Sequence, residues 1–186
     1  QAEYNEQLRN RPAQRRDLES NIIGFNPDAQ ERLSQYYRPY HGQLRELLDT
    51  TRAAFGQVLL IDCHSMPREA LSNVSGVFGR MPEIVLGDRF GSSCDNNLVE
   101  QIESYLVDAG FRVARNSPFA GAYITQAYGR PSSGQNCLQI EIDRSLYLNE
   151  ASVTKNDQFE DVRARLNSVA AQICELTRWP MQLAAE

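Results

Sequence analysis

Residues 58–67 read VLLIDCHSMP, and this stretch decides the fold of the chain. A largely apolar run at 58–62 is followed at once by polar side chains, and Pro67 prevents the strand from continuing. In an open α/β sheet, ligands bind just beyond the carboxyl ends of the buried strands. The stretch therefore predicts a buried strand that delivers Asp62 and His64 to the edge of the sheet where an active site would lie.

A helix is predicted before this stretch, and strands alternate with helices after it. Helical spacing of apolar residues predicts helices from Asn26 to Gly56 with a kink or break at Pro39, from Asp95 or Asn96 to Gly110, and from Phe159 to near Trp179. Further strands are predicted at 83–86, 111–115 and 137–143. The glycine-rich segment 117–136 is predicted to be a long irregular loop, and residues 1–21 a polar arm or loop. This alternation predicts a three-layer α/β/α sandwich with a mostly parallel mixed sheet.

Length and composition limit the classes of protein to which the chain can belong. With 186 residues, of which 41% are hydrophobic, it is predicted to be a single domain over 1–186. The net charge of −5 argues against a nucleic-acid-binding protein, and no apolar run approaches the ~18 residues that span a bilayer. Four scattered cysteines without a CxxC pair are typical of reduced thiols in a cytoplasmic protein. Because the chain starts with Gln1 rather than Met, we expect an N-terminal part to be absent from it.

His64 is the strongest candidate for chemistry, because it is one of only two histidines and follows a buried strand. An imidazole at that position suits a metal ligand or a general base, and the alternative is a histidine held by backbone groups. Strand alternation places Asp62 on the same side, where its carboxylate could hydrogen-bond to the imidazole of a metal-binding His64 and orient it. Cys63 faces the opposite side, so a nucleophilic Cys-His pair is not expected.

Glu141 lies within the alternating segment 137–143, on the same face as Gln139 and Asp143. A carboxylate there must face water, a charge partner or a site, because burial of a lone charge is prohibitively costly. Three interpretations therefore stay open for Glu141. It is a functional carboxylate, a residue of a solvent-facing edge strand, or one half of a structural ion pair with Arg144 or another arginine.

Several arginines lie in the long segment or in the loops that follow strands: Arg80, Arg89, Arg115 and Arg130. Guanidinium groups bind carboxylates through paired hydrogen bonds. Several of them on one rim, beside a histidine and a glutamate, would suggest a small anionic substrate. Each one taken alone is more often a surface residue.

Taken together, these motifs resemble the N-formylglutamate amidohydrolase (N-formylglutamate deformylase) family. The matching stretches occur in the family's order and cover about residues 30–176. They are PYH at 39–41, IDCHSMP at 61–67, IVLGDRFG at 84–91, NSPFAG at 116–121, YGRP at 128–131 and QIEIDRSLYLNE at 139–150. Any one of these motifs is weak evidence for the family, but six of them in the family's order are specific to it.

This family is similar in fold to zinc carboxypeptidases, so the resemblance implies a zinc-activated water, with another divalent metal as the alternative. It implies that His64 is a zinc ligand and that Glu141 is the base that activates the water and later protonates the leaving amine. The residues predicted to contact the substrate are Arg89, Arg130 and Asn116.

The family's first segment, of Pro-His-Ser-Gly type and with an acidic metal ligand, has no match in this chain. A catalytic zinc usually has three protein ligands, and the chain shows one convincing candidate. We therefore expect the other ligands to belong to an N-terminal part. The resulting hypothesis is a metal-dependent amidohydrolase that cleaves N-formyl-L-glutamate to L-glutamate and formate, as in histidine degradation. The alternatives are a metallo-hydrolase of another N-acyl amino acid or peptide, and a non-enzymatic binding domain with an incomplete metal site.

Overall fold

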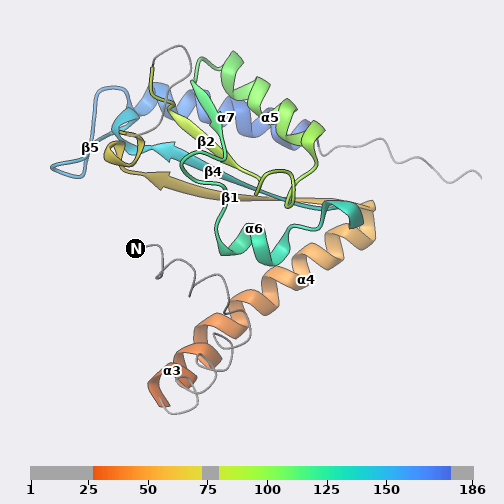
Figure 1. Ribbon diagram of the computed structural model, residues 1–186. Coiled ribbons are helices and arrows are strands. Elements are labelled where there is room, and N and C mark those ends of the chain that lie inside the picture. Colours follow the sequence, from red (N-terminus) through yellow and green to blue (C-terminus); the bar gives the residue numbers. More distant parts are fainter. Residues whose placement is uncertain (1–26, 73–79, 177–186) are drawn as a thin grey trace, which may run out of the picture. The chain divides into compact units, whose positions relative to one another are not determined.

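The computed structural model describes residues 27–72 and 80–176 (Figure 1). The chain divides into two compact units, Gln1–Asp49 and Thr50–Glu186. The predicted arm at 1–21, the cap at Asn26 and the end of the last helix near Trp179 lie outside the described residues. The single domain expected over the whole chain stays a prediction.

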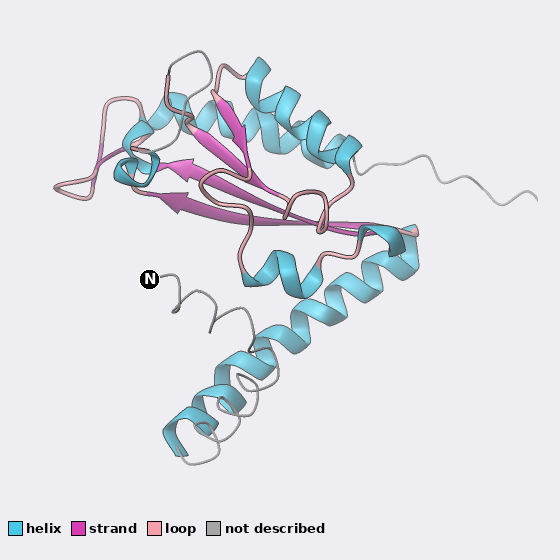
Figure 2. Cartoon of the chain, viewed as in Figure 1, coloured by secondary structure: helices cyan, strands magenta, loops and turns pink. Residues whose placement is uncertain are grey.

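The described part of the first unit is helical. α3 (Pro27–Arg32) leads into a π-helical segment (Leu33–Tyr37) and then into α4 (Arg38–Phe55), as the periodicity of the sequence predicts (Figure 2). Pro39 has no N–H to donate, and its ring crowds the carbonyl four residues before it. The wider π turn lies directly before Pro39 and provides room for the ring. The chain therefore stays helical at the position where the sequence predicts a kink or break.

The second unit is built on a four-stranded sheet in the order β1-β4-β2-β3. The strands are β1 (Val58–Met66), β2 (Ile84–Gly87), β3 (Val113–Arg115) and β4 (Gln135–Asp143). β1 pairs with β4 and β2 pairs with β3 in parallel, whereas β2 and β4 are antiparallel. The predicted mixed and mostly parallel sheet is therefore confirmed.

Helices cover both faces of this sheet. α5 (Asn96–Asp108) and α7 (Phe159–Leu176) pack together over one face, and the short helix α6 (Tyr123–Tyr128) lies against the other (Figure 1). The remaining elements are the hairpin strands β5 (Leu148–Asn149) and β6 (Thr154–Lys155) and the 3₁₀ turns Arg68–Leu71, Pro131–Ser133 and Arg144–Leu146. The predicted three-layer α/β/α arrangement is thus confirmed. None of the helices in the described part of the chain is long and apolar enough to cross a membrane.

The main hydrophobic core lies between the sheet and the pair α5 and α7. Leu138 and Ile140 of β4 and Ile84 and Leu86 of β2 are buried in it. Because side chains alternate along a strand, the odd-numbered residues of β4 face the opposite side, toward α6. This second face carries the candidate site.

β1 is longer than the sequence predicts. It runs to Met66, so the expectation that the strand ends at 62 is wrong. β4 pairs with β1 in parallel along its whole length, as far as Met66 opposite Asp143. These ladder hydrogen bonds keep the polar residues in strand geometry, which an apolar pattern cannot reveal. His64 therefore lies within the strand rather than beyond its end.

The segment 117–136 is not one irregular loop, and this prediction is wrong. It contains α6 and a 3₁₀ turn, and β4 already begins at Gln135. α6 has six residues and no side-chain hydrogen bond at its N-cap, Ala122. It therefore lacks both the length and the capping signal by which a sequence predicts a helix.

Gly87 is expected to tolerate no side chain. A Cβ atom on it would lie 2.6 Å from the backbone nitrogen of Gly121 and 2.8 Å from the carbonyl carbon of Ala120. Gly87→Ala should destabilise the fold by about 2–3 kcal/mol, because these backbone atoms cannot rotate away. Urea or thermal unfolding measures this loss.

The matched control for this variant is Gly42→Ala. Gly42 is an exposed residue of α4, and a Cβ atom on it would meet nothing within 4 Å. Alanine is the better helix former, so the stability of this variant should rise by up to about 1 kcal/mol. If both variants unfolded like the wild type, the close approach of the 120–121 backbone to β2 would be contradicted.

Candidate active site

The candidate site lies on β1 and β4, on the sheet face turned away from α5 and α7. In their parallel register Asp62 lies opposite Gln139, His64 opposite Glu141, and Met66 opposite Asp143. Paired residues of neighbouring strands point to the same face. The pairing of the two strands therefore brings an imidazole and three carboxylates together on one surface.

His64 and Asp62 contact each other. His64 Nε2 lies 3.0 Å from Asp62 Oδ1, and the side chains are 43% and 15% exposed, respectively. A carboxylate bound to one ring nitrogen fixes the orientation of the imidazole and leaves Nδ1 as the nitrogen that can bind a metal ion. Asp62 Oδ2 is buried, and it has no hydrogen-bond partner among the described residues. This geometry is compatible with the orienting role of Asp62, which stays a prediction.

Glu141 is 8% exposed and lies beside His64. β4 is flanked by β1 and β2, so the interpretation of Glu141 as a residue of a solvent-facing edge strand is wrong. Among the ion pairs of the described residues, none joins Glu141 to Arg144. The Oε1 atom of Glu141 instead accepts a hydrogen bond of 2.8 Å from Gln139 Nε2.

Burial is the main influence on the acidity of Glu141 and raises its pKa. The His64 imidazole and the hydrogen bond from Gln139 oppose this rise, whereas the Asp62 carboxylate adds to it. The result is a carboxylate with increased proton affinity. Such a group is suited to take up a proton from water and return it later.

Two arginines at the carboxyl ends of β1 and β4 belong to this region, and sequence reasoning did not assign either to the site. Arg68 Nη1 lies 2.5 Å from Oδ2 of the fully buried Asp143. Arg144 Nη2 donates to the carbonyl of Ser65 at 3.5 Å, and its Nε is buried without a hydrogen-bond partner among the described residues. Strand alternation already placed Asp143 on this face, but its partner comes from a different segment. A cavity of about 290 Å³ is lined by Pro67, Glu69, Arg144, Leu148, Glu150 and Val153.

Asn116 and Arg89 lie in the loops that follow β3 and β2. Asn116 Nδ2 donates to Asp88 Oδ1 at 2.6 Å, and Asn116 Oδ1 accepts from the backbone N–H of Asp88 at 3.1 Å. The backbone N–H of Arg89 donates to the carbonyl of Ala120 at 2.7 Å. Asn116 and Arg89 have φ values of 56° and 54°, a strained conformation for residues other than glycine, which these bonds stabilise. The amide of Asn116 thus supports the loop, and its contact with a substrate stays a prediction.

Arg130 is exposed and follows α6. Its Nη1 donates to the carbonyl of Gln126 at 3.0 Å and also contacts the carbonyl of Gly129. Carbonyls at the C-terminal end of a helix lack partners within the helix and attract cations. Arg130 therefore caps α6 in this structure, and its role in substrate binding stays a prediction.

The structure thus brings together some of the predicted site residues. Asp62, His64 and Glu141 lie on one face of two paired strands. In the described part of the chain, no hydrogen bond or ion pair joins them to the three predicted substrate-binding residues.

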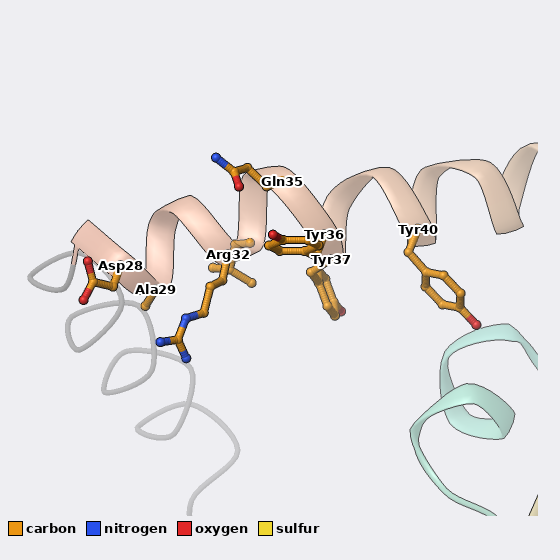
Figure 3. Close-up of a pocket in the computed structure, with 8 residues that line it drawn as sticks. Asp28, Ala29, Arg32, Gln35, Tyr36, Tyr37 and Tyr40 are labelled. Atoms are coloured by element: carbon orange, nitrogen blue, oxygen red, sulfur yellow. The ribbon is translucent and has the colours of Figure 1, made fainter.

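The first unit has a hollow of its own, along the helices α3 and α4. Tyr36, Tyr37 and Tyr40 lie along it (Figure 3). The other residues that line it are Asp28, Ala29, Arg32, Leu33 and Gln35. None of the predicted site residues is among them.

The donor groups of the candidate site fit one part of a zinc site. Imidazole and carboxylate are ligands that zinc prefers, and the buried, unpartnered oxygen of Asp62 lies beside the His64 ring. Within residues 27–72 and 80–176, however, no group of three or more His, Cys, Asp or Glu side chains is placed to hold a metal ion. His64 therefore suits the role of one ligand, and the described residues do not complete a ligand set.

The fold has counterparts among solved structures. The crystal structure of N-formylglutamate amidohydrolase from Ralstonia eutropha JMP134 matches with a TM-score of 0.74 and 37% sequence identity, over 81% of this chain and 54% of that one. A gene product of Agrobacterium tumefaciens matches with a TM-score of 0.52 and 20% identity, over 80% of this chain and 54% of that one. The second match shows a common fold alone.

Sequence comparison then defines the family. A model of the N-formylglutamate amidohydrolase family matches residues 6–148, a range that includes Asp62, His64 and Glu141. N-formylglutamate deformylases from Pseudomonas putida and Pseudomonas aeruginosa are 38% and 36% identical over 132 residues, which is 68% of this chain and 48% of each relative. The chain belongs to the N-formylglutamate amidohydrolase family. It spans about half the length of the curated relatives that it matches.

Proposed function

We propose that the protein is a metal-dependent amidohydrolase that cleaves N-formyl-L-glutamate to L-glutamate and formate. The observation that carries this proposal is the pairing of His64 with Glu141 across β1 and β4, in a chain of the N-formylglutamate amidohydrolase family. The two Pseudomonas relatives are named N-formylglutamate deformylase, which supports the choice of substrate.

The reaction adds water to the formyl carbon and breaks its bond to the glutamate nitrogen. Glu141 accepts a proton from the water as the oxygen attacks, and it donates this proton to the amine as the C–N bond breaks. Asp62 holds the His64 imidazole in place throughout. Zinc bound by His64 would polarise the formyl carbonyl and lower the pKa of a bound water. The products are formate and the free amine of glutamate.

The two carboxylates of N-formyl-L-glutamate require cationic or hydrogen-bonding partners. We propose Arg89, Arg130 and Asn116 for this role, and the structure adds Arg144 as a further candidate. The guanidinium of Arg144 is near enough to Glu141 to oppose the rise in its pKa. Arg144 also lines the 290 Å³ cavity, and its buried Nε has no hydrogen-bond partner among the described residues. A carboxylate is the natural partner of such a group.

Formate release tests this proposal. We expect the zinc-loaded full-length protein to convert N-formyl-L-glutamate to equal amounts of formate and glutamate, measured by a coupled formate dehydrogenase assay. A chelator should abolish the activity and added zinc should restore it. The Pseudomonas putida deformylase serves as the positive control. A zinc-loaded protein that leaves N-formyl-L-glutamate intact, while the control turns it over, would overturn the proposed activity.

A second candidate function is a binding domain of the same fold with an incomplete metal site. It is favoured by the lack, within the described residues, of a group of three or more metal-binding side chains. Metal content separates the two functions. About one tightly bound zinc per chain after dialysis supports the enzyme, whereas no bound zinc together with no formate release supports the binding domain.

We also propose a cytoplasmic location for the protein. Cys63, Cys94 and Cys137 carry free thiols, as a reducing compartment would maintain them. Burial raises the pKa of Cys94 and of Cys137 to about 12, so these two thiols stay protonated and unreactive at neutral pH.

A further inference from the structure

Gln139 is a buried residue of the candidate site to which the sequence pattern assigns no role. It is 2% exposed and lies between Asp62 on the neighbouring strand and Glu141 on its own. A buried amide requires hydrogen bonds at both of its ends. Gln139 Oε1 accepts from the backbone N–H of Ala122 at 2.7 Å, and Gln139 Nε2 donates to Glu141 Oε1 at 2.8 Å.

The chemistry of these partners allows only one orientation of the Gln139 amide. A backbone N–H can donate but cannot accept, so the group that faces Ala122 must be the oxygen. The NH₂ group must then face Glu141. Gln139 therefore always presents a donor to Oε1 of Glu141, and Oε1 cannot carry a proton on that side.

The two oxygens of Glu141 are consequently different. Oε1 is held by Gln139, whereas Oε2 has no hydrogen-bond partner among the described residues. Oε2 is also not among the fully buried, unpartnered atoms of these residues, and the Glu141 side chain keeps 8% of its surface exposed. Water can therefore approach Glu141 at Oε2, on the face shared with His64.

The segment that supports Gln139 lies close to the sheet. The segment that carries Ala122 packs on β2, where a Cβ atom on Gly87 would lie 2.6 Å from the nitrogen of Gly121. This leaves the segment no room to approach the sheet more closely. The backbone N–H that orients Gln139 therefore belongs to a closely packed segment.

We propose that Gln139 is a positioning residue for Glu141. It holds Oε1 and thereby leaves Oε2 as the atom that takes a proton from the attacking water and returns it to the leaving amine. This inference rests on the proposed function for the role of Glu141 in the reaction, but the contact between the two side chains can be tested without turnover.

The kinetic test compares Gln139→Met with Gln135→Met. Methionine keeps the length of the side chain and removes the donor, so kcat should fall about 10- to 100-fold while KM stays close to the wild-type value. Gln135 lies on the same strand, and its Nε2 donates a hydrogen bond to the carbonyl of Tyr128 at 2.6 Å. Gln135→Met removes this hydrogen bond. Its variant should keep the wild-type kcat. A merely structural role of Gln139 would lower stability in both variants without changing kcat per folded molecule.

A second test uses NMR and does not depend on activity. In the unsubstituted protein the Nε2 protons of Gln139 should exchange slowly with solvent, and the Glu141 side chain should be ordered. In Gln139→Met the Glu141 side chain should become mobile, whereas in Gln135→Met it should stay ordered.

The outcomes separate the two proposals. Slow exchange and an ordered Glu141, in a protein that releases no formate, would support the positioning contact and contradict the proposed function. Rapid exchange of the Gln139 amide would overturn the positioning role whether or not formate is released. An unchanged kcat in a folded Gln139→Met variant of an active protein would overturn it as well.

Discussion

Replacement of Glu141 by glutamine (Glu141→Gln) is expected to lower kcat for N-formyl-L-glutamate by about 10²- to 10⁴-fold, the range that a general base contributes. Glutamine has the same shape and can accept the hydrogen bond from Gln139 through its own oxygen, so the surroundings of the residue stay in place. It cannot take up a proton. KM should therefore remain close to the wild-type value, and steady-state rates of formate release measure both constants.

The same substitution is not expected to weaken the fold. Burial raises the pKa of Glu141, so the ionised carboxylate is less stable in the folded protein than in water. An acid whose pKa rises on folding loses stability as the pH rises above its unfolded value, and a neutral amide removes this loss at neutral pH. At neutral pH the midpoint of thermal unfolding of Glu141→Gln should therefore equal or exceed that of the wild type.

Glu100→Gln is the matched control for the Glu141 variant. Glu100 is exposed on α5, where it accepts a hydrogen bond from Asn96. The same chemical change at this position should leave both kcat and KM as they are. Wild-type turnover by Glu141→Gln would remove Glu141 from the proposed mechanism.

The sequence predicts on which face of its strand each site residue lies, but it does not predict which residue of the adjacent strand is paired with it. Ile140 faces the core. Successive side chains of a strand point to different faces, so the alternation along 137–143 places Glu141 on the face turned away from the core. That β4 pairs with β1, and that Glu141 lies opposite His64, depends on contacts between residues far apart in the chain. A local hydrophobic pattern contains no information about such pairing.

The predictions that failed involve segments whose structure depends on backbone partners elsewhere. β1 continues through its polar residues to Met66 because β4 supplies a ladder of hydrogen bonds. α6 is too short to show periodicity, yet its N-cap residue Ala122 is what orients Gln139. The role of Gln139 could not be inferred from its place in an alternating strand, because it depends on the two groups to which the buried amide is hydrogen-bonded.

His64→Ala and His41→Ala are expected to differ sharply in their effect on zinc binding. His64→Ala removes the proposed imidazole ligand and should lower zinc affinity by at least about 100-fold, beyond the range for an outer-shell residue. His41, the second histidine of the chain, lies in α4 with its ring 4.2 Å from that of Tyr37 and 5.0 Å from that of Tyr40. Its removal should lower stability through lost ring contacts and leave zinc affinity unchanged. Competition with a chromogenic chelator measures both affinities without any need for turnover.

Asp62→Asn shows whether the carboxylate acts through His64 or binds the ion itself. Asp62 Oδ1 is 3.0 Å from His64 Nε2, and asparagine can keep a contact there without the charge. An orienting residue should cost about 10- to 100-fold in zinc affinity, less than the loss of the ligand. A purely electrostatic site would respond more to the lost charge of Asp62 than to the loss of the His64 ring. The order His64→Ala, then Asp62→Asn, then His41→Ala is therefore expected only for an imidazole ligand that a carboxylate holds in place, and equal affinities for the two histidine variants would place any bound zinc elsewhere.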